Sequence, residues 1–163
     1  MVRKSHLGRA LRRYRAPVGL AMQSPVENCL AQIDRACREI AFCELADMLS
    51  KSRITALRGA LSGCREEELR GEPGLQLTSR TLAAELVSLE QTLPLEQAYR
   101  ADQRDLAIAR LNEAQKRLRV GRAADVGDDE TLLARVKSAL AISAMEVVTM
   151  ARHKAAARVG MSW

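Results

Sequence analysis

The chain has few aromatic and few β-branched residues. Aromatic residues make up 2% of its 163 positions, namely Tyr14, Phe42, Tyr99 and Trp163. It contains 10 valines, 5 isoleucines and 6 threonines, against 26 alanines and 22 leucines. Strands favour β-branched and aromatic side chains, whereas alanine and leucine favour helices. The composition therefore argues against an all-β or strongly α/β fold and predicts an all-α one.

Long apolar runs are also missing. No stretch of about 18 consecutive apolar residues occurs, so we expect no membrane-spanning helix. The apolar stretch 16–22 is short and is interrupted by Pro17 and Gly19. It does not have the uninterrupted apolar region of a secretory signal.

Cysteine and histidine are too sparse and too scattered for a metal site. The four cysteines are Cys29, Cys37, Cys43 and Cys64. None belongs to a C-x-x-C pair, and no histidine lies near them, so zinc binding has little support. The first three lie along one predicted helix, too far apart to form disulfides with one another. We expect free thiols in a reducing compartment, the cytoplasm.

Patterns that would indicate catalysis are lacking. His6 and His153 are the two histidines, and neither has an acidic neighbour to orient its ring. The acidic runs 66–68 and 128–130 are typical of a solvated segment and of a helix start. No glycine-rich phosphate-binding motif is present. We therefore expect a protein that is not an enzyme, with no catalytic, cofactor-binding or metal-binding residues.

Acidic residues are absent from the N-terminal segment. The net charge is +6, and the first carboxylate is Glu27. From there on, 20 basic residues face 20 acidic ones, so the excess charge belongs to the first 26 residues. We predict a flexible basic arm over 1–23 and a single helical domain over 24–163. The candidates for contact with a polyanion are Arg3, Lys4, Arg9, Arg12, Arg13 and Arg15.

The arm allows several interpretations. Leu7, Leu11, Tyr14 and Val18 recur at helical spacing, so a helix here would be amphipathic and cationic. Such a segment could contact the phosphates of a nucleic acid or an anionic membrane surface. It also has the composition of a mitochondrial presequence, which would place the protein in mitochondria. A segment without a role is the remaining alternative.

The rest of the sequence predicts a bundle of about four amphipathic helices. Ser24-Pro25-Val26-Glu27 has the pattern of a helix start with a capping box. This helix should reach about residue 51, with an extension to 61 left open, before a glycine-rich break over 62–77. The further helices are expected at about 78–92, 95–120 and 129–159, with Pro94 stopping or kinking the chain and a loop at 121–128.

Two of the predicted helices have broad apolar faces, over 26–49 and 132–151. Such faces either cover each other within one chain or bind a protein partner or a second copy. The candidate interface residues are Ile33, Ile40, Met48, Leu133, Val136, Leu140 and Val147. From these faces we predict a non-enzymatic helical adaptor, chaperone or assembly subunit that acts through protein–protein contacts. The alternative is a nucleic-acid-associated protein whose arm contacts phosphates, and no small-molecule substrate is indicated.

Overall fold

The computed structural model describes residues 24–71, 74–125 and 129–159, and this part of the chain is entirely helical apart from caps and turns. The all-α prediction is confirmed there, while the basic arm over 1–23 lies outside the described residues.

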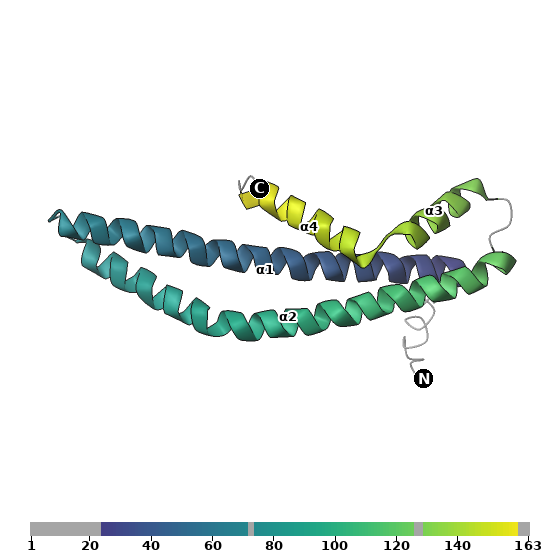
Figure 1. Cartoon of the computed structure of the whole chain (residues 1–163), viewed down its shortest axis with the longest axis horizontal. Helices are drawn as coiled ribbons and strands as arrows, with labels where there is room; N and C mark the ends of the chain where they lie inside the picture. The colour runs from purple at the N-terminus through teal and green to yellow at the C-terminus, as the bar shows by residue number, and fades with distance from the viewer. Residues whose placement is uncertain (1–23, 72–73, 126–128, 160–163) are drawn as a thin grey trace, which may run out of the picture.

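The helices form a long hairpin with two short helices along one end of it. Helix α1 (Pro25–Leu69) and helix α2 (Leu75–Asp125) run antiparallel, as Figure 1 shows. Helix α3 (Glu130–Ala141) and helix α4 (Ala144–Val159) follow and pack along one end of the hairpin, α4 mainly against α1 and α3 against both α1 and α2. Because α1 contacts the other three helices, it is the central element of the fold.

Helix α1 begins where the sequence predicts. The Ser24 hydroxyl accepts a hydrogen bond from the Glu27 backbone amide at 3.1 Å, and the Glu27 carboxylate accepts one from the Ser24 amide at 3.1 Å. This reciprocal pair satisfies two amides that a helix start otherwise leaves without partners. The capping-box prediction is therefore confirmed.

The break predicted over 62–77 is much shorter in the structure. Helix α1 continues to Leu69, and the turn to α2 needs only residues 70–74. Gly71 and Gly74 have φ angles of 85° and 100°, a left-handed conformation that glycine adopts at little cost. Gly59 and Gly63 lie within the helix in open space. A helical glycine costs only about 1 kcal/mol, which neighbouring contacts with α2 can offset.

The two long helices meet along a seam with coiled-coil spacing. In the half near the turn, the seam consists of Ile54, Leu57, Leu61 and Cys64 on α1 and Leu82, Leu86, Leu89 and Leu93 on α2. All are buried or half-buried and alternate at intervals of three and four residues. Glu68 accepts a hydrogen bond from Ser79, and Glu39 accepts one from Arg110. These contacts, one near the turn and one in the other half of the hairpin, are consistent with a single antiparallel register.

Pro94 bends α2 without ending it. The predicted helices at 78–92 and 95–120 are one continuous helix, with the proline inside. Figure 1 shows α2 bowing away from α1 near its middle. The seam spacing also changes here, because Leu89, Leu93 and Gln97 follow one another at two successive intervals of four. Two successive intervals of four are equivalent to a four-residue insertion in the heptad pattern, which locally unwinds a coiled coil. Contacts on both sides of Pro94 keep the chain helical.

The single helix predicted over 129–159 is two helices. Ile142 leaves helical geometry, with φ −68° and ψ 132°, and Ser143 begins α4. The Ser143 hydroxyl accepts from the Glu146 amide at 3.2 Å, and the Glu146 carboxylate accepts from the Ser143 amide at 2.8 Å. From α2, the buried Gln115 amide donates to the carbonyl oxygens of Ala139 and Ile142. These bonds satisfy carbonyls at the end of α3, so the break is built into the fold.

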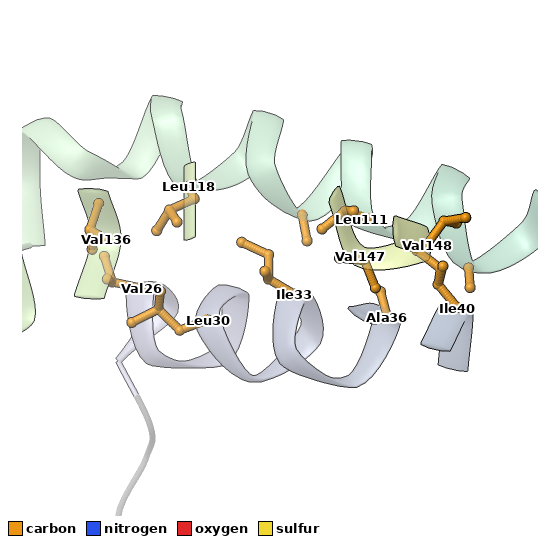
Figure 2. Packing of buried hydrophobic residues seen from close by; sticks show 12 residues of the cluster. Val26, Leu30, Ile33, Ala36, Ile40, Leu111, Leu118, Val136, Val147 and Val148 are labelled. Atoms are coloured by element: carbon orange, nitrogen blue, oxygen red, sulfur yellow. The ribbon is translucent and has the colours of Figure 1, made fainter. Parts of the chain in front are cut away.

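The core lies at the end of the hairpin that α3 and α4 cover. Figure 2 shows side chains from all four helices converging there, including Ile33 and Ile40 of α1, Leu111 of α2, Val136 of α3 and Val147 of α4. Toward the turn the core thins out, and the first buried residue of α2 is Ala107. The half of the hairpin nearer the turn is thus a two-helix arm. Among the described helices, none has the length and apolar character needed to cross a membrane.

Candidate functional site

The predicted interface residues lie within or beside the core of this chain. Ile33, Ile40, Val136 and Val147 are buried, with exposed fractions of 4% or less. Leu133 and Leu140 are half-buried and contact the core, and Met48 is half-buried on α1. The broad faces over 26–49 and 132–151 therefore cover each other to a large extent. A surface for a partner has to be sought elsewhere on the described helices.

The remaining predictions concern the cations of the basic arm, the histidines and metal binding. The six candidate polyanion-binding cations of the arm lie outside the described residues. His153 is exposed on α4, with its Nδ1 2.9 Å from the Thr149 carbonyl oxygen. Within the described ranges, no cluster of three or more histidine, cysteine or acidic side chains is arranged to hold a metal ion.

A groove runs between α1 and α2 on the face opposite α4. Three hollows follow one another along it, with volumes of about 260, 300 and 850 Å³, and adjacent hollows share lining residues. The wall on α1 includes Asn28, Gln32, Arg35, Glu39 and Phe42, and the wall on α2 includes Tyr99, Gln103, Arg110, Arg117 and Gly121. Each wall follows one stripe of its helix, because the intervals are sums of three and four residues.

The position of the groove follows from helical geometry. Glu44 of α1 contacts Arg152 of α4. Phe42 precedes Glu44 by two residues, which places its side chain more than half a turn around α1. The face that carries Phe42 therefore points away from α4, and no residue of α3 or α4 lines the three hollows.

Two exposed aromatic side chains stand on opposite walls of the largest hollow. Phe42 is 70% exposed and Tyr99 is 65% exposed, and both line the hollow of about 850 Å³. Leu95 and Leu106, also exposed, lie four residues before and seven residues after Tyr99, on the same stripe of α2. Leu49 lies seven residues after Phe42 on α1 and is exposed as well. These five side chains form an apolar surface that the chain leaves uncovered, which we call the open face.

A carboxylate between two arginines bridges the groove. Glu39 accepts a hydrogen bond from Arg35 of its own helix at 3.0 Å and from Arg110 of α2 at 3.0 Å. The pKa of Glu39 is below its usual range, and the largest cause is the hydrogen bond from Arg35. Burial has a smaller effect that raises this pKa, and the hydrogen bond from Arg110 lowers it further. Both guanidiniums remain largely exposed, at 78% for Arg35 and 60% for Arg110. We call these three residues the arginine clamp.

Further arginines border the same groove. Arg38 forms an ion pair with Asp34 on the outer surface of α1. Arg100 reaches from α2 to Asp47 at 2.7 Å and also contacts Glu96. Because Arg100 is well covered, its bond to Asp47 mainly joins the two helices at a polar position of the seam.

A second charged cluster lies on the α4 side of α1. Glu44 is buried and accepts hydrogen bonds from Arg104 of α2 at 2.7 Å and from Arg152 of α4 at 3.0 Å. Burial raises the pKa of Glu44, but the hydrogen bonds and charges of the two arginines outweigh it and keep the pKa below its ordinary value. This ionised carboxylate connects three helices. Both of its oxygens accept hydrogen bonds from arginine side chains of the neighbouring helices.

The four cysteines are free thiols, as the sequence predicts. Burial, helped by the charge of Asp34, raises the pKa of Cys37. Burial also raises the pKa of Cys43, which lies at the floor of the largest hollow. A raised pKa keeps a thiol protonated at neutral pH.

Sequence reasoning missed the open face and the arginine clamp. Phe42 lies within the range 26–49, which the sequence predicts to be a broad apolar face. The signal against this is its register, because Phe42 falls outside the seam that passes through Ala36, Ile40 and Cys43. Tyr99 joins it only through the antiparallel pairing of α1 with α2. No family model, curated protein or solved structure matches the chain, so the functional argument depends on this geometry.

Proposed function

We propose that the protein is a non-enzymatic helical adaptor or assembly subunit that binds another protein at the open face. The observation that carries this proposal is the pair Phe42 and Tyr99, which are 70% and 65% exposed on facing walls of one groove. Both aromatic side chains of the described residues are therefore exposed to water, whereas the residues of the core, such as Ile40 and Val136, are buried.

The composition of the open face supports protein binding. Aromatic residues and arginine are enriched at protein interfaces, and binding energy concentrates on a few such residues. A pair of helices with a groove between them accepts a third helix through ordinary ridge-and-groove packing. On the opposite face of α1, the chain's own α3 and α4 already pack in this way. A partner helix at the groove would extend the same mode of packing.

We propose no catalytic role for the ionisable side chains. The buried carboxylate of Glu44 already has two guanidinium partners, and His153 lies exposed on the surface of α4. The free thiols of α1 support our proposal of a reducing compartment, the cytoplasm.

Site-specific photo-crosslinking tests the proposal. A photoreactive phenylalanine analogue replaces Phe42 or Tyr99 in the full chain, expressed in its native cell. The matched control replaces Val87, which is 51% exposed on the half of α2 near the turn. We expect a discrete protein adduct from the first two positions and much less of it from the control.

Two results would overturn the proposal. Equal yields of the same adduct at all three positions would show that the open face is not a specific binding surface. An adduct that nuclease digestion removes would support the nucleic-acid alternative instead.

A further inference from the structure

We infer that the partner at the open face presents an acidic amphipathic helix, with a carboxylate at the arginine clamp and an apolar side chain between Phe42 and Tyr99. This inference rests on the proposed function, since it specifies the chemistry of the protein that binds there.

The charge of the groove is the first argument. Its lining residues include five arginines and one acid. The arginines are Arg35, Arg38, Arg100, Arg110 and Arg117, and the acid is Glu39. Arg38, Arg100 and Arg117 are paired with acidic side chains beside the groove, namely Asp34, Asp47, Glu96 and Glu113. The excess positive charge therefore lies at the arginine clamp, where Arg35 and Arg110 share the single carboxylate of Glu39. A net positive charge there favours a negatively charged group on the partner and disfavours a positive one.

The arginine clamp provides the second argument. Arg35 uses its Nε for Glu39, and Arg110 uses one terminal nitrogen. Because a guanidinium carries five N–H donors, donors remain on both side chains for another carboxylate. Glu39 thus holds two arginines from different helices close together across the groove. A guanidinium can bind a planar carboxylate through two parallel N–H donors, so each clamp arginine can contribute to binding it.

Because the arginine clamp is exposed, its two arginines can bind a carboxylate of another protein in addition to Glu39. Arg35 and Arg110 are largely solvent-exposed, and exposed ion pairs contribute little to folding. An incoming carboxylate can therefore share these guanidiniums without destabilising the hairpin. The buried pair of Arg104 with Glu44 has no such freedom, since Glu44 is 6% exposed.

The spacing along α1 sets the shape of the partner. Arg35 and Phe42 are seven residues apart, which is about 10 Å or two turns along a helix. A partner helix with an acidic residue and an apolar residue separated by two turns reaches both sites.

Charge argues against two other occupants. The segment 1–23 of this chain carries six cations and no acid, so it would place like charge beside the clamp. A second copy docked through the same face would bring a second arginine clamp, of the same net charge, to the groove. An acidic helix avoids both conflicts.

Two designed peptides test the inference. Both are helices of about 18 residues, or five turns, with leucines at intervals of three and four. The first carries glutamates beside the leucines, and the second carries lysines at the same positions. We expect the glutamate peptide to bind the full chain at least about tenfold more tightly by fluorescence anisotropy, with an affinity that falls as salt is added.

Matched variants locate the binding. The double change Arg35→Gln with Arg110→Gln should weaken binding of the glutamate peptide by about tenfold or more. Arg53→Gln removes an equally exposed α1 arginine that pairs with Glu85 outside the groove, and it should leave affinity unchanged. Circular dichroism should show the same helicity in all variants, since the substituted side chains are exposed.

Several outcomes would overturn the inference. The first is tighter binding of the lysine peptide than of the glutamate peptide. The second is a loss of affinity in Arg53→Gln equal to that in the double variant, and the third is no binding of either peptide. If deletion of residues 1–23 raised the affinity for both peptides equally, the chain's own segment would be the occupant of the groove. If the inference fails while photo-crosslinking at Phe42 still yields a protein adduct, the open face binds a partner of different chemistry. Loss of that adduct would refute the proposed function itself.

Discussion

Removal of the charge on Glu44 should destabilise the fold in a pH-dependent manner. In Glu44→Gln, a neutral amide replaces the carboxylate that receives Arg104 and Arg152. A hydrogen bond to a charged group contributes about 1.5–3 kcal/mol. Because Arg104 and Arg152 are 31% and 58% exposed, water replaces part of this contribution. We therefore expect a loss of about 2 kcal/mol in the free energy of unfolding, well below the sum for two bonds.

Urea unfolding followed by circular dichroism measures this loss. For a chain of this size, 2 kcal/mol corresponds to a fall in Tm of about 4–8 °C. The matched control is Glu113→Gln, which removes an exposed carboxylate paired with Arg117 and should cost at most about 0.5 kcal/mol.

The pH dependence provides the sharper test. The pKa of Glu44 is lower in the folded chain than its ordinary value, so the unfolded chain binds the proton more readily. Its contribution is therefore complete above the unfolded pKa of about 4.3 and is lost as the pH falls through the folded pKa. The stability difference between wild type and Glu44→Gln should shrink below pH 4. A difference that matches the Glu113 control at pH 7, or that stays constant down to pH 3, would refute this reasoning.

Two further changes test the local structure. Gln115→Leu leaves the carbonyl oxygens of Ala139 and Ile142 without their donor, so we expect a loss of about 1–3 kcal/mol and faster amide exchange at the start of α4; unchanged exchange would contradict the role given to this amide. Gly59→Ala should raise stability by about 0.5–1 kcal/mol because its site is helical and open, whereas Gly71→Ala should lower it because φ is 85°. Thermal unfolding of the pair measures both, and a stabilised Gly71→Ala would be inconsistent with the described turn.

The sequence predicted the fold class and the start of α1 well, because both depend on local chemistry. Alanine and leucine content indicates helices, and Ser24 with Glu27 marks a cap. The same capping pattern occurs at Ser143 and Glu146, where it was overlooked within a helix predicted to be continuous. That break could have been found from the sequence.

The helix ends near glycine and proline were harder to predict. Gly63 and Pro94 are local signals for a break, yet both lie within long helices. Contacts across the α1–α2 seam outweigh the local cost, and such contacts depend on the antiparallel register. Local propensity alone therefore predicts more helix ends within the hairpin than the structure has.

The candidate site could not be predicted from the sequence because its parts are distant in the chain. Arg35 and Arg110 meet only through the pairing of α1 with α2, as do Phe42 and Tyr99. Apolar periodicity selected Ile40 and Val136, which pack inside the chain. Periodicity identifies a face that is buried, but it does not distinguish burial by the chain itself from burial by a partner.

The most direct test of the account is a double substitution on the open face. Phe42→Asp with Tyr99→Asp places charge on two exposed side chains, so we expect unfolding free energy within about 0.5 kcal/mol of wild type. The tagged full chain, isolated from its native cell, is then sized by gel filtration. If the open face binds a partner, wild type should elute in a larger complex and the folded double variant should elute alone. A folded double variant that keeps the complex would contradict it.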